Sequence, residues 1–347
     1  MKTMLALILN PFEELRTEHQ CLQHFKDTDT YIPPIEVVVG TKKRYKNIKD
    51  EIISTNENIT VQVIPLQQVL QKFFELPNIF ELTLTYIRNL ENEKILYCNV
   101  IQGLKWREKK NFGEKIVFPI LFYQDDYETN NLLGSRKGLG KLGTVYIIYP
   151  CLPPSLRSKV ENIFLLSLYK CEDLQYVTLK TMLSRAIIEL KSLESTGITI
   201  RTSSGQHKIY FSLAGVIGDN LAVYSMLGFC LINRADINST FDESDCILRT
   251  DENYKNDLLK NNPAETGITR PSVLSDIKSS NTIDLLTVDV MHDILEGILE
   301  YDLGLILNYF IKEAKFFSLD NFNDRIESLY YGPDEIRNKP RDMKKIR

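Results

Sequence analysis

The arrangement of apolar and polar residues changes along the chain near residue 115. Residues 11–30 and 61–90 carry apolar side chains at helical spacing, which predicts a mostly helical first third of the chain. Between them, the lysine-rich and polar segment 41–59 predicts a loop. After residue 115, apolar residues instead follow one another directly, which is typical of buried strands.

Four apolar segments predict strands, and they cover residues 116–124, 141–149, 160–169 and 208–218. A helix is an alternative for the third of them. Residues 175–195 have a helical period, which predicts a helix that ends near Gly197. A polar, irregular stretch follows at 233–284, and residues 289–310 have the pattern of an amphipathic helix.

Aspartates follow two of the predicted strands directly. The apolar run IVFPILFYQ ends on Asp125 and Asp126, and the segment 208–218 ends on Asp219. Two adjacent carboxylates repel each other unless a cation or hydrogen bonds hold them. An aspartate after a strand is also a common turn residue or helix cap. Each position is therefore a candidate metal ligand with a structural alternative.

The last predicted helix carries further acids. Asp289, Asp293 and Glu296 lie three or four residues apart, which places them on one face of the helix, next to His292. A solvated helix face and a structural histidine are the alternatives to a metal site. The chain thus reads strand–Asp, strand, strand, helix, strand–Asp, insertion and acidic helix. This is the order of an RNase H-like α/β fold, in which a mixed sheet is flanked by helices.

Three converging carboxylates have a specific chemical use. They hold two divalent cations about 3.5–4 Å apart, one of which activates an attacking hydroxyl while the other stabilises the leaving oxygen of a phosphodiester. Hard oxygen ligands favour Mg²⁺ or Mn²⁺. The sequence therefore predicts a magnesium-dependent site built from these acids.

Composition excludes some classes of protein. The chain of 347 residues is 43% hydrophobic and 25% charged, which is typical of a folded protein of about two domains. Its net charge of −4 does not suit a protein that binds nucleic acid with its whole surface. Six cysteines without a C-x-x-C pair predict a reducing compartment. The apolar stretch in MKTMLALILN is too short for a signal peptide, and no segment reaches the roughly 18 apolar residues of a membrane span.

Five segments together resemble one known family. They read NPFEELRTEHQ at 10–20, IPLQQVLQKFFELPNIFE at 64–81, FPILFYQDDYETNNLLGSRKGLGKLGTVYI at 118–147, YFSLAGVIGDNLAVYSMLGF at 210–229 and DVMHDILEGILEYDL at 289–303. In this order they are similar to the animal branch of the CACTA (En/Spm) transposases, which are DDE enzymes with an RNase H-like core. The resemblance implies a nuclear protein that cuts transposon ends and joins the 3′ hydroxyls to target DNA, and it is compatible with a homo-oligomer.

The resemblance also implies a role for each acid. Asp125 matches the first catalytic acid, in the block DDYE, and Asp219 matches the second, in the block GDN. Glu296, in the block MHDILEG, matches the third. The auxiliary candidates are Asp126, which would share the first position, Asp289 and Asp293, which are alternatives for the third acid, and His292, which would assist the metal site or position the DNA strand.

Two features depart from the family pattern. Relatives carry a C-x-x-C pair shortly after the GDN block, which has the form of half a zinc site. Here Ser239 and Asp242 stand at those positions, and Cys230 and Cys246 have another spacing, so that we expect no zinc. The chain also ends at NKPRDMKKIR, where relatives continue with a further helical region. A degenerate or domesticated relative that acts as a non-catalytic binding protein is therefore the alternative function.

The expected regions are a mostly helical N-terminal region at 1–111, an RNase H-like core at 112–312 with an insertion at about 231–285, and the start of a truncated C-terminal region at 313–347. The basic residues Arg136, Lys137 and Lys141 predict either phosphate contacts or a solvated loop. A hydrolase of small phosphate esters is the last alternative, because the chain has no phosphate-binding loop of the G-x-x-x-x-G-K-[ST] type.

Overall fold

The structure is a computed structural model of the 347-residue chain. It describes residues 12, 15–48, 51–109, 113–129, 140–157, 159–230, 249–278, 281–332, 340 and 343, without the side chains of residues 46–48, 51, 52 and 296. The chain forms two compact units, residues 1–287 and 288–347. Within the described ranges, no helix is long and apolar enough to cross a lipid bilayer.

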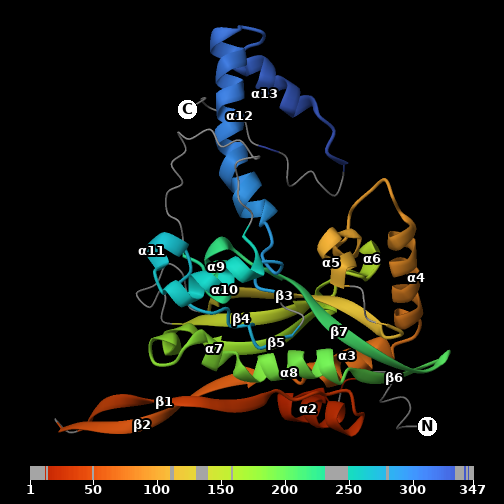
Figure 1. Ribbon diagram of the computed structural model, residues 1–347, viewed down its shortest axis with the longest axis vertical. Coiled ribbons are helices and arrows are strands. Elements are labelled where there is room, and N and C mark those ends of the chain that lie inside the picture. Colours follow the sequence, from red (N-terminus) through yellow and green to blue (C-terminus); the bar gives the residue numbers. More distant parts are fainter. Residues whose placement is uncertain are drawn as a thin grey trace. The chain divides into compact units, whose positions relative to one another are not determined.

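The first unit is built around one mixed sheet, which has seven strands in the described part of the chain (Figure 1). In the order in which they pair, the strands are β1 (Ile35–Ile48), β2 (Glu51–Val63), β5 (Ile163–Lys170), β4 (Lys141–Ile148), β3 (Ile116–Glu128), β7 (Gly205–Ile217) and β6 (Ile198–Thr202). β3, β4 and β5 pair in antiparallel order, whereas β3 and β7 are parallel. The predicted α/β class and the four predicted strands are therefore confirmed.

Helices pack on the sheet through an aromatic core. α3 (Leu66–Phe74) buries Leu66, Leu70 and Phe74, which share one helical face. The Phe74 ring lies 5.3 Å from that of Phe118 in β3 and 5.9 Å from that of Phe211 in β7, measured between centroids. α8 (Ser184–Ser195) packs against β7 and beside α3, and it follows the short α7 (Leu179–Met182). These two helices confirm the helix predicted at 175–195.

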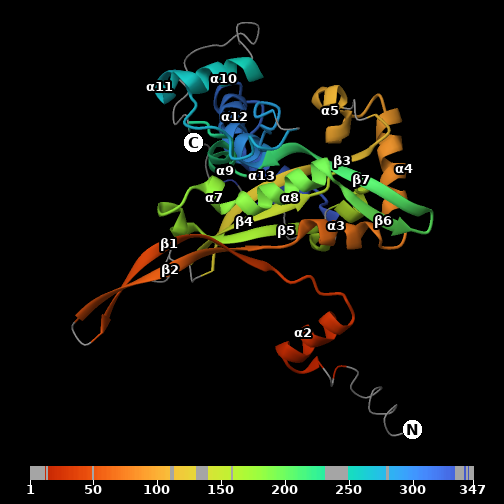
Figure 2. The ribbon, with the colours of Figure 1, turned by 60° about the horizontal axis from the view of Figure 1, so that its bottom comes forward.

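Residues 41–59 differ from the prediction of a loop. Of these, 41–48 belong to β1 and 51–59 to β2, and the two strands pair with each other along their whole length. Only Val61–Val63 of β2 pair with β5, so that the rest of the hairpin extends past the sheet (Figure 2). Most described side chains in this part of the hairpin are exposed and polar, so that the hydropathy pattern carries no strand signal.

The first unit has further helices among its described residues. They are α2 (Glu18–Asp27), α4 (Ile79–Asn92), α5 (Leu104–Lys109), α6 (Pro154–Arg157), α9 (Asn220–Leu227), α10 (Asp251–Lys260) and α11 (Pro263–Thr266). α10 and α11 lie in the segment predicted to be irregular. They are short and mostly polar, which explains why the pattern did not reveal them.

The second unit contains a helical segment that alternates between π-helix and α-helix. A π-helical stretch, Val290–Ile298, continues as α12 (Leu299–Asn308) and then as a second π-helical stretch, Tyr309–Glu313; α13 (Leu319–Ser328) follows. A Cβ atom at Gly297 would lie 2.7 Å from the carbonyl oxygen of His292, so that the first wide turn requires glycine there. The helix predicted at 289–310 is confirmed in position, although it is not a regular α-helix.

Candidate functional site

The two adjacent aspartates lie inside β3 rather than after it. Asp125 and Asp126 both pair with β4, and β3 continues to Glu128. The prediction that the strand ends on this pair is therefore wrong. The parallel pairing of β3 with β7 ends earlier, at Tyr123 and Ile217. The aspartates consequently lie in the part of β3 that pairs with β4 but not with β7.

Asp125 is exposed, and hydrogen bonds hold it on both its carboxylate and its backbone. Its Oδ2 accepts a hydrogen bond of 2.8 Å from the hydroxyl of Tyr123, and its Oδ1 accepts one of 2.7 Å from the backbone N–H of Asp126. The hydroxyl of the buried Thr144 donates to the Asp125 carbonyl oxygen at 2.9 Å. A carboxylate oxygen accepts more than one such bond, so that the oriented carboxylate keeps capacity for a cation.

Asp126 belongs to the opposite face of β3, because successive side chains of a strand alternate. Its Oδ2 lies 2.7 Å from the Nζ of Lys141, and this hydrogen bond is the main cause that raises the pKa of Lys141. The alternation and the ion pair together relieve the repulsion expected between the neighbouring carboxylates. The structure therefore does not place Asp126 on the side of the strand where Asp125 lies.

Asp219 lies in the turn that follows β7. It is the N-cap of α9, and its Oδ1 accepts a hydrogen bond of 2.6 Å from the backbone N–H of Ala222. The turn also needs Gly218, since a Cβ atom there would lie 2.6 Å from the carbonyl oxygen of Gln124 in β3. The helix cap named as the structural alternative is thus present, and it uses one of the two carboxylate oxygens.

Asp125 and Asp219 occupy corresponding positions just beyond the end of the parallel pairing between β3 and β7. Each lies two residues beyond the last pair, Tyr123 with Ile217. Burial is the main cause that raises the pKa of Tyr123 to about 12, and the negative charges of both aspartates add to it. The charge of Asp219 also contributes to the raised pKa of Lys141. The structure therefore brings the first two predicted acids to one edge of the sheet.

A cleft of about 630 Å³ opens beside Asp125. Besides Asp125, it is lined by three tyrosines, two polar residues and three aliphatic residues, namely Tyr123, Tyr127, Tyr146, Asp126, Thr144, Ile148, Val160 and Ile163. The rings of Tyr123 and Tyr146 lie 6.0 Å apart between centroids. The cleft thus combines an aromatic wall with a carboxylate, which suits a ligand that has both a flat ring and a polar or cation-bound group.

The acids predicted for the third position belong to the second unit. Asp289 caps the π-helical stretch by accepting hydrogen bonds from the backbone N–H groups of Met291 and His292. Its carboxylate also contacts the Nδ1 atom of His292, and this bond is the main cause that lowers the pKa of Asp289. Asp293 accepts the N–H of Asp289 at 3.1 Å. Asp289 and His292 therefore have structural tasks at the helix start, and the side chain of Glu296 lies outside the described part.

The carboxylates of the first unit are of a type that binds some divalent metals better than others. In the described part of the chain, no three His, Cys, Asp or Glu side chains form a group that could hold a metal ion. Asp125 and Asp219 nevertheless supply two carboxylates at one edge, and Mg²⁺ is commonly bound through one or two carboxylates while it keeps several waters. Zinc prefers nitrogen and sulfur ligands. The two aspartates therefore fit Mg²⁺ or Mn²⁺ and not zinc.

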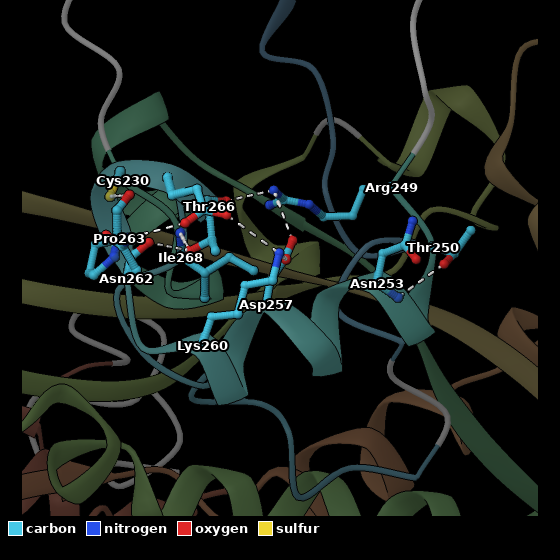
Figure 3. A network of polar contacts seen from close by, with 11 residues as sticks. Cys230, Arg249, Thr250, Asn253, Asp257, Lys260, Asn262, Pro263, Thr266 and Ile268 are labelled. Carbon is cyan, nitrogen blue, oxygen red and sulfur yellow. Dashed lines mark hydrogen bonds and ion pairs between the residues drawn. The ribbon is translucent and has the colours of Figure 1, made fainter.

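A polar network holds the described end of the insertion (Figure 3). Arg249 donates a hydrogen bond of 2.6 Å to the carbonyl oxygen of Thr266, and the Sγ of Cys230 lies 3.6 Å from the carbonyl oxygen of Pro263. Outside the described residues lie Arg136, Lys137, Ser239, Asp242 and Cys246. The expected absence of zinc therefore stays a prediction. The phosphate contacts of Arg136 and Lys137 also stay a prediction.

The sequence patterns missed two residues that orient Asp125. Tyr123 lies two positions before Asp125 in the same strand, and the alternation of strand side chains could have placed the two on one face. Thr144 lies in another strand, and only the register between β3 and β4 reveals it as the partner of Asp125. Both residues are part of the candidate site.

Comparisons with known proteins do not assign a family. No family model matches the chain, and no curated protein matches it either. The resemblance to CACTA transposases therefore stays a prediction that rests on the residues of this chain.

Proposed function

We propose that the chain is a transposase-like protein derived from a DNA transposon. It would cleave phosphodiesters and transfer DNA strands with Mg²⁺ (or Mn²⁺) held by Asp125 and Asp219, and Glu296 is the third acid that the resemblance implies. The observation that carries the proposal is the placement of Asp125 and Asp219 at corresponding positions of the parallel neighbours β3 and β7. Metal-dependent phosphodiester chemistry uses converging carboxylates of this kind.

The topology of the sheet supports an RNase H-like core. β3, β4 and β5 form an antiparallel series, α8 follows, and β7 returns parallel to β3. Leu286 then forms a parallel bridge with Val216 of β7, after the insertion and before the acidic helix. This element order agrees with the order of strands, helix and acids that motivated the RNase H-like prediction.

Each described residue of the site has a task in this proposal. Bound Mg²⁺ would supply the charge that activates an attacking hydroxyl and stabilises the leaving oxygen of the phosphodiester. Asp125 and Asp219 would hold the cation, and Tyr123 keeps the Asp125 carboxylate in one orientation. Lys141 neutralises Asp126, so that this carboxylate does not compete for the metal.

DNA is the substrate class in this proposal, and the nucleus is the location that follows from it. The aromatic cleft beside Asp125 supports a nucleic-acid substrate, because tyrosine rings are surfaces on which nucleobases stack. A phosphodiester at Asp125 would place a neighbouring base within reach of this wall. A homo-oligomer is compatible with the proposal and is not required by it.

A non-catalytic relative is the second candidate. Asp219 uses one carboxylate oxygen to cap α9, and Asp289 caps the π-helical stretch of the second unit. These structural tasks would preserve both aspartates in a protein that no longer cleaves DNA. Such a protein would keep the fold and act through binding alone.

Metal binding separates the two candidates. Mn²⁺ and Mg²⁺ are titrated into the purified chain and into the variant Asp125→Asn/Asp219→Asn, with binding followed by calorimetry. The matched control is Asp251→Asn/Asp276→Asn, which removes the same charge from two aspartates that pair with exposed lysines elsewhere in the first unit. We expect saturable binding in the parent and in the control, and none in the site variant.

Cleavage of labelled duplex DNA in the presence of Mg²⁺ then tests the reaction. Metal-dependent cleavage by the parent that the site variant lacks would support the transposase-like function. Equal, weak metal binding in all three proteins would overturn the catalytic proposal and favour the non-catalytic relative.

A further inference from the structure

The outer part of the β1–β2 hairpin forms an arm, which comprises residues 40–48 of β1 and 51–59 of β2. β2 joins β5 only through Val61–Val63, and no other described strand pairs with the arm. Figure 2 shows the hairpin extending from the sheet as a two-stranded ribbon. A two-stranded ribbon has little stability of its own in water. The pairing within the arm therefore adds little to the free energy of folding, so that a binding role of its surface is the alternative reason for the arm.

Cross-strand partners in a hairpin share a face, so that the register divides the arm into two sets of side chains. The described side chains of one set are Thr41, Lys43, Tyr45, Ser54, Asn56 and Asn58. All of them are exposed, and none carries a carboxylate. This set is the carboxylate-free face of the arm. The other set contains Lys42, Arg44, Thr55 and Glu57.

The two faces differ in how their cations are paired. On the second face, the Nζ of Lys42 lies 2.6 Å from Asp173, and a guanidinium nitrogen of Arg44 lies 3.2 Å from Glu57. Lys43, on the carboxylate-free face, forms no ion pair with any described residue. The described side chains of this face therefore comprise one cation and no carboxylate, although the chain as a whole has 46 acidic and 42 basic residues.

The residue types of the carboxylate-free face are those that contact DNA. Lysine binds phosphate, and serine, threonine, asparagine and tyrosine donate hydrogen bonds to phosphate or sugar oxygens. Asparagine also reads adenine in the major groove, which admits a two-stranded ribbon. Lysines in an edge strand also prevent pairing with foreign strands. That role requires charge alone and does not explain Tyr45, which is 66% exposed, or the two asparagines.

We propose that the carboxylate-free face of the arm binds double-stranded DNA. Lys43 contacts a phosphate, and its neighbours Tyr45 and Asn56 contact the same backbone or the adjoining groove. The choice of DNA as the ligand rests on the proposed function, whereas the choice of face rests on the register and the charges of the arm. The charge of Lys43 attracts DNA phosphates locally, whereas the net negative charge of the whole protein repels them.

Fluorescence anisotropy with a labelled duplex tests this proposal. The test variant is Lys43→Ala/Asn56→Ala, and the control is Arg44→Ala/Thr55→Ala. Each changes one cross-strand pair of the same ribbon and removes one cation and one polar side chain, on opposite faces. We expect the test variant to bind several-fold more weakly and its salt slope to fall by about one unit, the value of one lost phosphate contact. The control should bind like the parent.

A fold check and a second variant keep this test decisive. Circular dichroism and thermal melting compare the variants with the parent, and Lys43→Gln replaces the double variant if that protein does not fold. Equal losses in test and control variants would overturn the role of the carboxylate-free face. They would leave the metal site, and with it the proposed function, untouched.

The arm and the metal site can also be separated by their own variants. The fold loss of duplex affinity caused by Lys43→Ala/Asn56→Ala should be the same in the Asp125→Asn/Asp219→Asn background as in the parent, because neither aspartate belongs to the arm. DNA binding that depends on Lys43 in a protein without a metal site would support the arm and overturn the catalytic proposal. A parent that does not bind duplex DNA at low salt would overturn both.

Discussion

The hydroxyl of Tyr123 donates a hydrogen bond of 2.8 Å to Oδ2 of Asp125. The two residues lie two positions apart in β3, so that the alternation of strand side chains places them on one face. Burial is the largest cause that raises the pKa of Tyr123 to about 12, and the hydrogen bond to Asp125 is the next. The protonation of the phenol is therefore coupled to the charge of the candidate metal ligand.

Asp125→Asn should lower the pKa of Tyr123, because the amide removes the negative charge that disfavours the phenolate. The pKa should stay above that of an ordinary tyrosine, because the burial is unchanged. NMR of ring-labelled tyrosine during a pH titration measures both values, and Tyr123→Phe identifies the signal. An unchanged Tyr123 pKa in the Asp125→Asn protein would show that the two groups are not coupled.

The raised pKa of Tyr123 also predicts a change of stability with pH. The folded protein holds this proton more tightly than the unfolded chain, in which tyrosine titrates near about 10. The contribution to stability is thus fully present below about pH 10 and is lost as the pH rises towards about 12. Urea unfolding of the parent and of Tyr123→Phe across this range measures it. The stability of the parent should fall more steeply than that of the variant.

Asp219 can be tested as a helix cap and as a metal ligand by two separate substitutions. Asparagine caps a helix about as well as aspartate, whereas alanine in place of a cap costs about 1 kcal/mol. We therefore expect Asp219→Ala to lower the free energy of unfolding by about 1 kcal/mol, and Asp219→Asn to leave it near that of the parent. Both should weaken Mn²⁺ binding. Parental Mn²⁺ affinity in the Asp219→Asn protein would assign the residue to the cap alone.

Lys42 should be important for the stability of the first unit. Its Nζ lies 2.6 Å from Asp173, and the two side chains are only 13% and 3% exposed. Lys42→Ala leaves a buried carboxylate without its cation, which costs about 3–5 kcal/mol. Arg44→Ala is the control, since it breaks the exposed pair with Glu57 in the same strand and costs at most about 1 kcal/mol. Urea unfolding measures both, and equal small losses would contradict the prediction.

The patterns of the sequence identified the centre of the sheet correctly. β3, β4, β5 and β7 lie where apolar runs predict strands, and α8 lies where the helical period predicts a helix. These elements are buried in the core, and their apolar residues therefore form patterns that are visible in the sequence. The β1–β2 hairpin was missed for the opposite reason. Its base is buried through Ile59, Val61 and Val63, but most described side chains of its outer part are exposed and polar, so that this part resembles a loop.

The candidate site was predictable in its residue types and only partly in its geometry. Local pattern alone specifies that acids follow the apolar runs of β3 and β7. It does not specify that β3 continues past Asp126, or that Lys141 neutralises this residue. Both facts depend on the register of β3 with β4. A shift of this register by one residue would move each side chain to the other face of the sheet.

Residue order thus specifies which segments are strands and helices, which acids are available, and that the chain has a core. The folded chain decides which strands become neighbours, and with that which carboxylates meet. Asp125 and Asp219 are far apart in sequence, yet the parallel pairing of β3 with β7 places them at one edge. Hydropathy and helical period are properties of neighbouring residues, whereas strand pairing joins distant segments through backbone hydrogen bonds that no local pattern encodes.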